Sequence, residues 1–148
     1  MRKATTAFLV ALAVILGCAN VPPRSGSDEE AQRFGALFLK VLRWDGLMES
    51  VKLIAPERRK EYAQKITDGK LIDKLKITEF EAKDVTRTGK DTVIMPADLS
   101  WFVEPEVTVH NEHIVIDLRY AQGAWVVEGM QGGPLPFEPL PPLPDGGS

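Results

Sequence analysis

The sequence predicts an α+β domain in which amino-terminal helices pack on a curled antiparallel sheet. Three features predict this class: an apolar period of 3.6 residues after residue 27, a period of two after residue 72, and turn signals between successive apolar runs. Helices that precede a run of hairpin-connected strands are typical of α+β folds. We therefore expect the helices to cover one face of the sheet.

A capping box predicts where the first helix begins. Ser27 is an N-cap residue, and Glu30 stands three positions later, as the capping box requires. The apolar residues that follow recur at intervals of three and four and form one face: Phe34, Leu37, Phe38, Val41 and Leu42. We expect this helix to end near the segment 44–46, where a glycine follows the last apolar residue.

Two shorter helices are predicted after it. Residues 47–54 repeat the apolar pattern, and Pro56 is of the type that often occupies the first turn of a helix. This third helix should stop at Gly69, with Tyr62 and Ile66 facing inward.

Alternation of apolar and polar residues predicts four strands from residue 72 onward. A change of parity near residues 78–79 indicates a β-bulge in the first strand, and residues 87–91 form a turn. Residues 92–95 and 99–103 are strand-like, with an interruption at Pro96 that suits an edge or a bulge. Residues 114–120 form the next strand, and a turn at 121–123 leads into the last.

This order of elements resembles the cone-shaped domains of the nuclear transport factor two and ketosteroid isomerase superfamily. The resemblance covers residues 28–131 and implies a curled sheet that wraps a long helix and leaves a pocket at its open end. A cystatin-like helix on a sheet is the alternative fold. In the superfamily, catalytic members use carboxylates, tyrosines or histidines in the pocket, but no local motif assigns such a role to a residue here.

Five residues are of the types that would line such a pocket: Tyr62, Asp98, Trp101, Tyr120 and Trp125. Asp98 has two interpretations, a pocket base whose pKa is raised by burial or a residue that begins a strand after Pro96. The two tryptophans have two interpretations as well, because aromatic side chains line ligand pockets and also fill cores.

The segment His110–His113 most resembles a metal site. Alternating apolar neighbours place it on a strand, where residues three apart point to opposite faces, so the two imidazoles should not converge on one ion. The sequence also has no glycine-rich phosphate loop and no nucleophile elbow. We therefore assign no metal, no cofactor and no catalytic residue.

The amino terminus has the features of an export signal. Arg2 and Lys3 precede an uncharged run at 4–19, which is shorter than the roughly 20 residues that span a bilayer. The run ends in Ile15-Leu16-Gly17-Cys18, which resembles the lipobox of bacterial lipoproteins. The resemblance implies cleavage between Gly17 and Cys18 and a diacylglyceryl group on the Cys18 sulfur. The alternative is a buried cysteine in an uncleaved apolar helix.

The chain is thus divided into a signal peptide (1–17), a tether (18–27), an α+β domain (28–131) and a proline-rich tail (132–148). We expect the tail to be disordered and laid on the domain in part through Phe137. The nine residues that follow Cys18 up to Ser27 reach at most about 30 Å, which keeps the domain close to a membrane.

Charge excludes one class of partner. The signal peptide holds two of the 18 basic residues and none of the 21 acidic ones, so the mature net charge is −5 with neutral histidines. A net-acidic chain without a long basic run is unsuited to nucleic acid. Ala19 and Asn20 follow the cysteine in place of the Asp that retains enterobacterial lipoproteins in the inner membrane, so the resemblance implies an outer-membrane location facing the periplasm in a two-membrane organism.

These features predict a non-enzymatic, lipid-anchored protein of the bacterial cell envelope, whose domain serves binding or assembly. Its partners would be the membrane, through the lipid on Cys18, and an envelope protein. The alternative is a binder of small hydrophobic ligands, or an isomerase-like enzyme, that uses the pocket of the cone.

Overall fold

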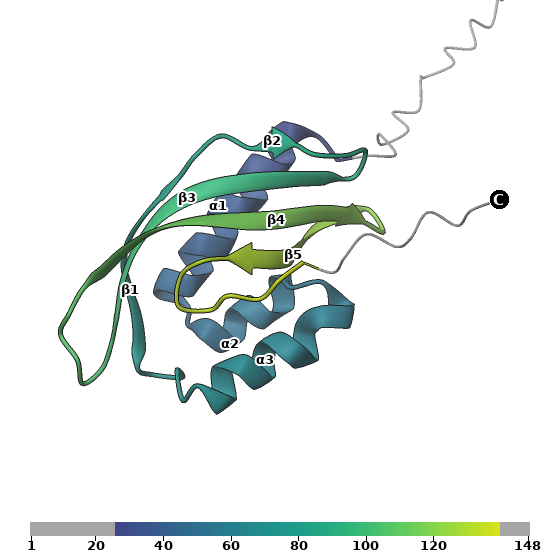
Figure 1. The fold of residues 1–148 in the computed structure, drawn as a ribbon. Helices are drawn as coiled ribbons and strands as arrows, with labels where there is room; N and C mark the ends of the chain where they lie inside the picture. The colour runs from purple at the N-terminus through teal and green to yellow at the C-terminus, as the bar shows by residue number, and fades with distance from the viewer. Residues whose placement is uncertain (1–25, 140–148) are drawn as a thin grey trace, which may run out of the picture.

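The structure, a computed structural model, describes residues 26–139. Helices occupy the first part and an antiparallel sheet the second, as predicted, and the sheet is not closed into a barrel (Figure 1). It has five strands in place of the predicted four, because Thr86 and Arg87 form a short strand beside β3. The helical elements are α1 (Asp28–Trp44), α2 (Leu47–Ser50), η1 (Val51–Leu53), η2 (Pro56–Arg58) and α3 (Arg59–Asp68). The strands are β1 (Leu75–Ala82), β2 (Thr86–Arg87), β3 (Thr92–Val103), β4 (His110–Ala121) and β5 (Ala124–Gln131).

The predicted cap begins α1. The Ser27 Oγ accepts a hydrogen bond from the Glu30 backbone N at 3.1 Å, and three acidic residues in the first turn favour the positive end of the helix dipole. The helix ends before Gly46, whose φ of 98° lies in the region that favours glycine. Pro56 and Gly69 bound the third helical segment as expected, because they begin η2 and cap α3.

The strands lie in the order β1-β3-β4-β5, with β2 beside β3 beyond the end of β1. A shift of register between Ile77 and Glu79 confirms the bulge that the parity change predicts. The predicted interruption at Pro96 is wrong, since β3 is continuous and Pro96 pairs with Val115 of β4. The Pro96 carbonyl accepts from the Lys83 backbone N at 2.8 Å, on the side where the edge passes from β1 to β2. Proline has no backbone N–H to donate. At Pro96 this missing donor falls at the gap between β1 and β2, where the pairing along this side of β3 is already interrupted.

Helix α1 lies across one face of the sheet, which we call the inner face (Figure 1). Alternate residues of β3 and β4 point into this layer and are almost fully buried with the apolar side of α1. Gly35 faces the sheet, and a Cβ at this position would collide with the Met95 Sδ. A glycine therefore allows the helix to lie close to β3.

The described part of the tail belongs to the core, and the predicted domain end at residue 131 is too early. Leu135 is 3% exposed and Phe137 is fully buried. The Phe137 backbone exchanges hydrogen bonds of 3.0 and 2.8 Å with Met130 at the edge of β5. A proline-rich segment lacks backbone N–H donors, but a single aromatic residue in it can still pack against the domain. The chain from 132 to 137 therefore completes the domain.

Phe137 also holds α3 in place. Its ring lies 5.1 Å from the Tyr62 ring, and the Arg58 guanidinium carbon lies 5.2 Å over it. The Lys65 ammonium donates to the Pro136 carbonyl at 3.0 Å. The tail therefore fills the space between α3 and β5.

The signal peptide, Cys18 and most of the tether lie outside the described residues, as does the tail after Pro139. None of the helices within residues 26–139 combines the length and apolar character that crossing a bilayer requires.

We predict that Phe137→Ala lowers the free energy of unfolding by about 3–5 kcal/mol, because it leaves a cavity between α3 and β5. Glu138→Ala, at the next and exposed position, should change it by less than about 0.5 kcal/mol. Equilibrium urea unfolding of the full chain measures both. A Phe137→Ala protein as stable as the Glu138→Ala protein would mean that the tail does not belong to the core.

Candidate functional site

The five residues predicted to line one pocket lie in separate places. Tyr62 is on α3, Asp98 and Trp101 are on β3, and Tyr120 and Trp125 are on β4 and β5. Tyr62 is buried, and its hydroxyl lies 2.8 Å from the Ser50 Oγ. Burial raises its pKa far above the usual value, which the bond to Ser50 offsets in part. This tyrosine fastens α3 to α2 and is closed off from solvent.

The tryptophans fill the two ends of the sheet. Trp101 is half-buried and stacks on His110 of β4, with ring centroids 4.3 Å apart. Trp125 is 6% exposed and meets the Tyr120 ring edge-on at 5.4 Å. Tyr120 and Trp125 are cross-strand partners and are the only two of the five that the fold brings together. Trp101 and Trp125 therefore pack on the core of the domain and do not line a common ligand pocket.

The Tyr120–Trp125 pair fixes where the chain enters the domain. A Cβ at Gly26 would collide with both rings, so the glycine backbone lies directly against them. The Arg87 guanidinium donates to the Gly26 carbonyl at 2.9 Å and to the Asp28 carboxylate. Residue 26 is thus held at the end of the molecule where α1 begins.

Asp98 lies on the outer face of the sheet, the face opposite α1. Its carboxylate lies 2.9 Å from the His113 Nδ1 and 3.1 Å from the Lys83 ammonium, which also contacts Glu81 at 2.8 Å. The hydrogen bond from His113, followed by that from Lys83, lowers the Asp98 pKa. The interpretation of Asp98 as a buried base with a raised pKa is therefore wrong, because its side chain is half exposed and paired.

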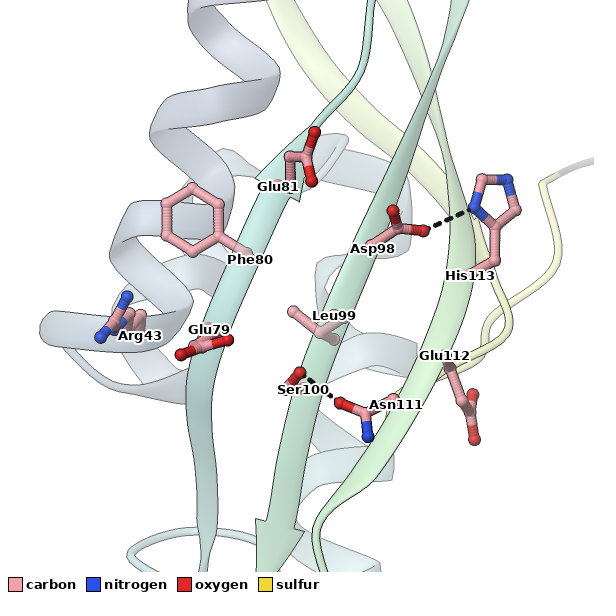
Figure 2. A pocket seen from close by; sticks show the side chains of 10 residues that line it. All are labelled: Arg43, Glu79, Phe80, Glu81, Asp98, Leu99, Ser100, Asn111, Glu112 and His113. Atoms are coloured by element: carbon pink, nitrogen blue, oxygen red, sulfur yellow. Dashed lines mark hydrogen bonds and ion pairs between the residues drawn. The ribbon is translucent and has the colours of Figure 1, made fainter.

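Asp98 and His113 belong to a shallow hollow of about 590 Å³ over β1, β3 and β4 (Figure 2). The other residues that line it are Arg43 of α1, Glu79, Phe80 and Glu81 of β1, Leu99 and Ser100 of β3, and Asn111 and Glu112 of β4. The Ser100 hydroxyl donates to the Asn111 Oδ1 at 2.6 Å, and His113 instead contacts Asp98 (Figure 2). This serine and histidine are thus not joined as nucleophile and base. Of the charged residues in the lining, Glu81 and Asp98 share the Lys83 ammonium, whereas Arg43, Glu79 and Glu112 form no salt bridge within residues 26–139.

The two histidines lie on opposite faces of β4, as their spacing predicts. His110 stacks on Trp101, whereas His113 contacts Asp98. Within residues 26–139, no group of three histidine, cysteine, aspartate or glutamate side chains is placed to hold a metal ion.

Sequence reasoning missed a second hollow, of about 390 Å³, at the junction of α1 and α2. We call it the α1–β1 groove, because its lining comes from residues 42–49 on one side and 72–77 on the other. Trp44, Met48 and Ile72 line it and are 67%, 44% and 42% exposed. The available signal was a tryptophan two positions after Leu42, the last inward residue of the helix.

We predict that the Asp98 carboxyl titrates below the usual value of about 3.9. His113→Ala should raise its midpoint most, and Lys83→Met should raise it less, whereas Glu112→Gln should leave it in place. Because the folded-state pKa is lowered, the pairing stabilises the fold above about pH 4 and is lost as the pH falls through that pKa. Carbon-detected NMR titration of the Asp98 side chain measures the midpoint, and an unchanged value in His113→Ala would contradict the pairing.

No family model matches the chain, and no curated protein matches it. A solved structure that it resembles is that of a SEC-C motif containing protein from Rhodopseudomonas palustris, with a TM-score of 0.48 and 18% identity. The match covers 74% of this chain and 82% of that one. At these values the likeness assigns neither a family nor an activity to this chain.

Proposed function

We propose that this chain is a lipid-anchored protein of the bacterial cell envelope whose α+β domain binds or assembles with other envelope components and catalyses no reaction. The observation that carries the proposal is the sequence Ile15-Leu16-Gly17-Cys18 at the end of a short uncharged run after Arg2 and Lys3. Diacylglyceryl and amide-linked acyl chains on Cys18 would supply the two or more chains that hold a protein stably on a bilayer.

The way the chain enters the domain supports this role. Gly26 is pinned by Tyr120, Trp125 and Arg87. From Cys18 to Gly26 the chain spans at most about 29 Å, because eight residue steps cover no more than about 3.6 Å each. A lipid on Cys18 would therefore keep the beginning of α1 near the membrane surface. In an organism with two membranes we place the protein on the outer membrane, facing the periplasm.

We further propose that the sheet curls around α1 in the manner of a cone. The length of α1 and the two register shifts, at Ile77/Glu79 in β1 and at Asp117/Leu118 in β4, support this shape, since bulges increase strand twist. A cystatin-like helix on a sheet is the alternative.

A ligand binder or isomerase-like enzyme that uses the pocket of the cone is the alternative function. It gains no support from the described side chains, because Tyr62 is closed off in the core and Asp98 lies on the outer face. Tyr120 and Trp125 are occupied by the entering chain at Gly26.

We predict that the full-length protein, expressed in a bacterium, has the mass of a chain cleaved before Cys18 with acyl chains added and partitions into detergent. Cys18→Ala should abolish both the added mass and the partition, because the sulfur that carries the lipid is absent. Intact-mass spectrometry and phase separation in detergent measure the two properties. Asn20→Ala is the matched control and should leave both unchanged.

An unmodified mass in the aqueous phase for the wild-type protein would contradict the proposal. Cys18 would then be an ordinary thiol, and the location in the envelope would lose its main support.

A further inference from the structure

The last described residues leave the edge of β5 on the side of the outer face. After β5 the chain turns back along this edge, where Phe137 bonds to Met130 (Figure 1). A Cβ at Gly129 would lie 2.6 Å from the Pro139 backbone N. Gly129 is paired with Asp117, which points to the outer face because its two neighbours in β4 are buried. Directly paired residues of two strands share a face, so Pro139 lies on the outer face.

Glu138 lies close to Asp117, as this route requires. Burial raises the pKa of the Asp117 carboxyl, the hydrogen bond from the Gln131 Nε2 at 3.2 Å lowers it in part, and the Glu138 charge raises it further. The two residues that end the described chain are thus both beside outer-face positions of the sheet.

The edge of β5 is already occupied ahead of this point. The Ala55 backbone N donates to the Val127 carbonyl at 2.8 Å, and Ile54 forms a parallel bridge with Val127. The chain after Pro139 therefore has no free ladder to follow along β5 and must leave the edge.

An apolar strip lies on the outer face beside the place where Pro139 sits. We call it the outer strip and define it by Ile94, Pro96 and Val115. Pro96 is paired with Val115, and Ile94 is paired with Asp117, so the strip borders the residue next to Gly129. Its three residues are half-buried, and neither Ile94 nor Val115 belongs to the core cluster formed by the described residues.

The next four residues, Leu140-Pro141-Pro142-Leu143, have the spacing needed to cross this strip. Two adjacent prolines favour polyproline II, in which residues three apart share a side and lie about 9 Å from each other. Measured from Pro139 over β5, Leu140 is then about 3 Å along the segment and Leu143 about 12 Å along it. In a sheet, β4 lies about 5 Å and β3 about 10 Å from β5. Leu140 thus comes over β4 and Leu143 over β3, the two strands that form the outer strip.

We propose that residues 140–143 dock across the outer strip and cover it from within the same chain. Attachment at Pro139 gives this segment an effective concentration on the order of millimolar, so that weak apolar contacts suffice. The preformed polyproline conformation also reduces the conformational entropy that docking costs. A second copy or another protein would have to displace the tail to reach this face.

Methyl NOE spectroscopy of the purified full chain tests the contact. We expect cross-peaks between the Leu143 δ-methyls and the Ile94 δ1-methyl, and between the Leu140 δ-methyls and the Val115 γ-methyls. A mixture of ¹³C-labelled and unlabelled chains distinguishes contacts within one chain from contacts between copies.

The double variant Leu140→Asp with Leu143→Asp should lose both cross-peaks, because two charged side chains do not pack on an apolar strip. The Val115 methyls should then relax faster in the presence of a soluble gadolinium chelate, since the strip is open to solvent. Asp145→Ala is the matched control in the same tail and should leave the cross-peaks and the relaxation unchanged. All substitutions lie outside the buried core, and the remaining methyl spectrum reports that the domain is folded.

Three results would overturn the proposal: no cross-peaks between the tail and the strip, cross-peaks only between different copies, or equal relaxation of the Val115 methyls in the wild-type chain and the double variant. Each of them leaves the lipid anchor intact, because the proposal does not depend on Cys18.

Discussion

The packing of α1 across the inner face of the sheet forms the core around which the other elements are arranged. The apolar side of the helix is buried mainly by the inner face of β3 and β4, and that face is buried mainly by the helix. Neither has another surface of comparable size to cover it. Gly35 makes the contact close, because any side chain there would meet Met95. The direction in which α1 crosses the sheet then decides where its two ends lie, and the functional features of the molecule follow from those ends.

At one end of α1, the entering backbone lies on the Tyr120–Trp125 pair and is bonded by Arg87, so the route toward Cys18 starts from a fixed point. At the other end, Trp44 stands over a groove that opens onto the core. The two ends of the helix therefore differ, and the entry point of the chain and the α1–β1 groove lie about 25 Å apart along it.

Two other surfaces are satisfied within the chain. The outer face of the sheet carries Asp98, His113 and Lys83, which bond to one another rather than to an outside group. The edge of β5 is covered by the Ile54 bridge and by Phe137, so it offers no free ladder for another strand. The α1–β1 groove stands out against this background because its apolar rim has no such covering among the described residues.

Features that depend on near neighbours along the chain could be predicted from the residues alone: the Ser27 cap, the end of α3 at Gly69, the bulge after Ile77 and the opposite faces of His110 and His113. Each arises from backbone geometry over a few residues. Which distant residues meet could be seen only in the folded chain. The pairing of Asp98 with His113 depends on the β3–β4 register, and the continuity of β3 through Pro96 depends on the broken edge beside it. The contact of Phe137 with the domain was expected from the sequence, but its place between α3 and β5 was not. Local pattern carries no information about such contacts, because they form only when separate elements are packed together.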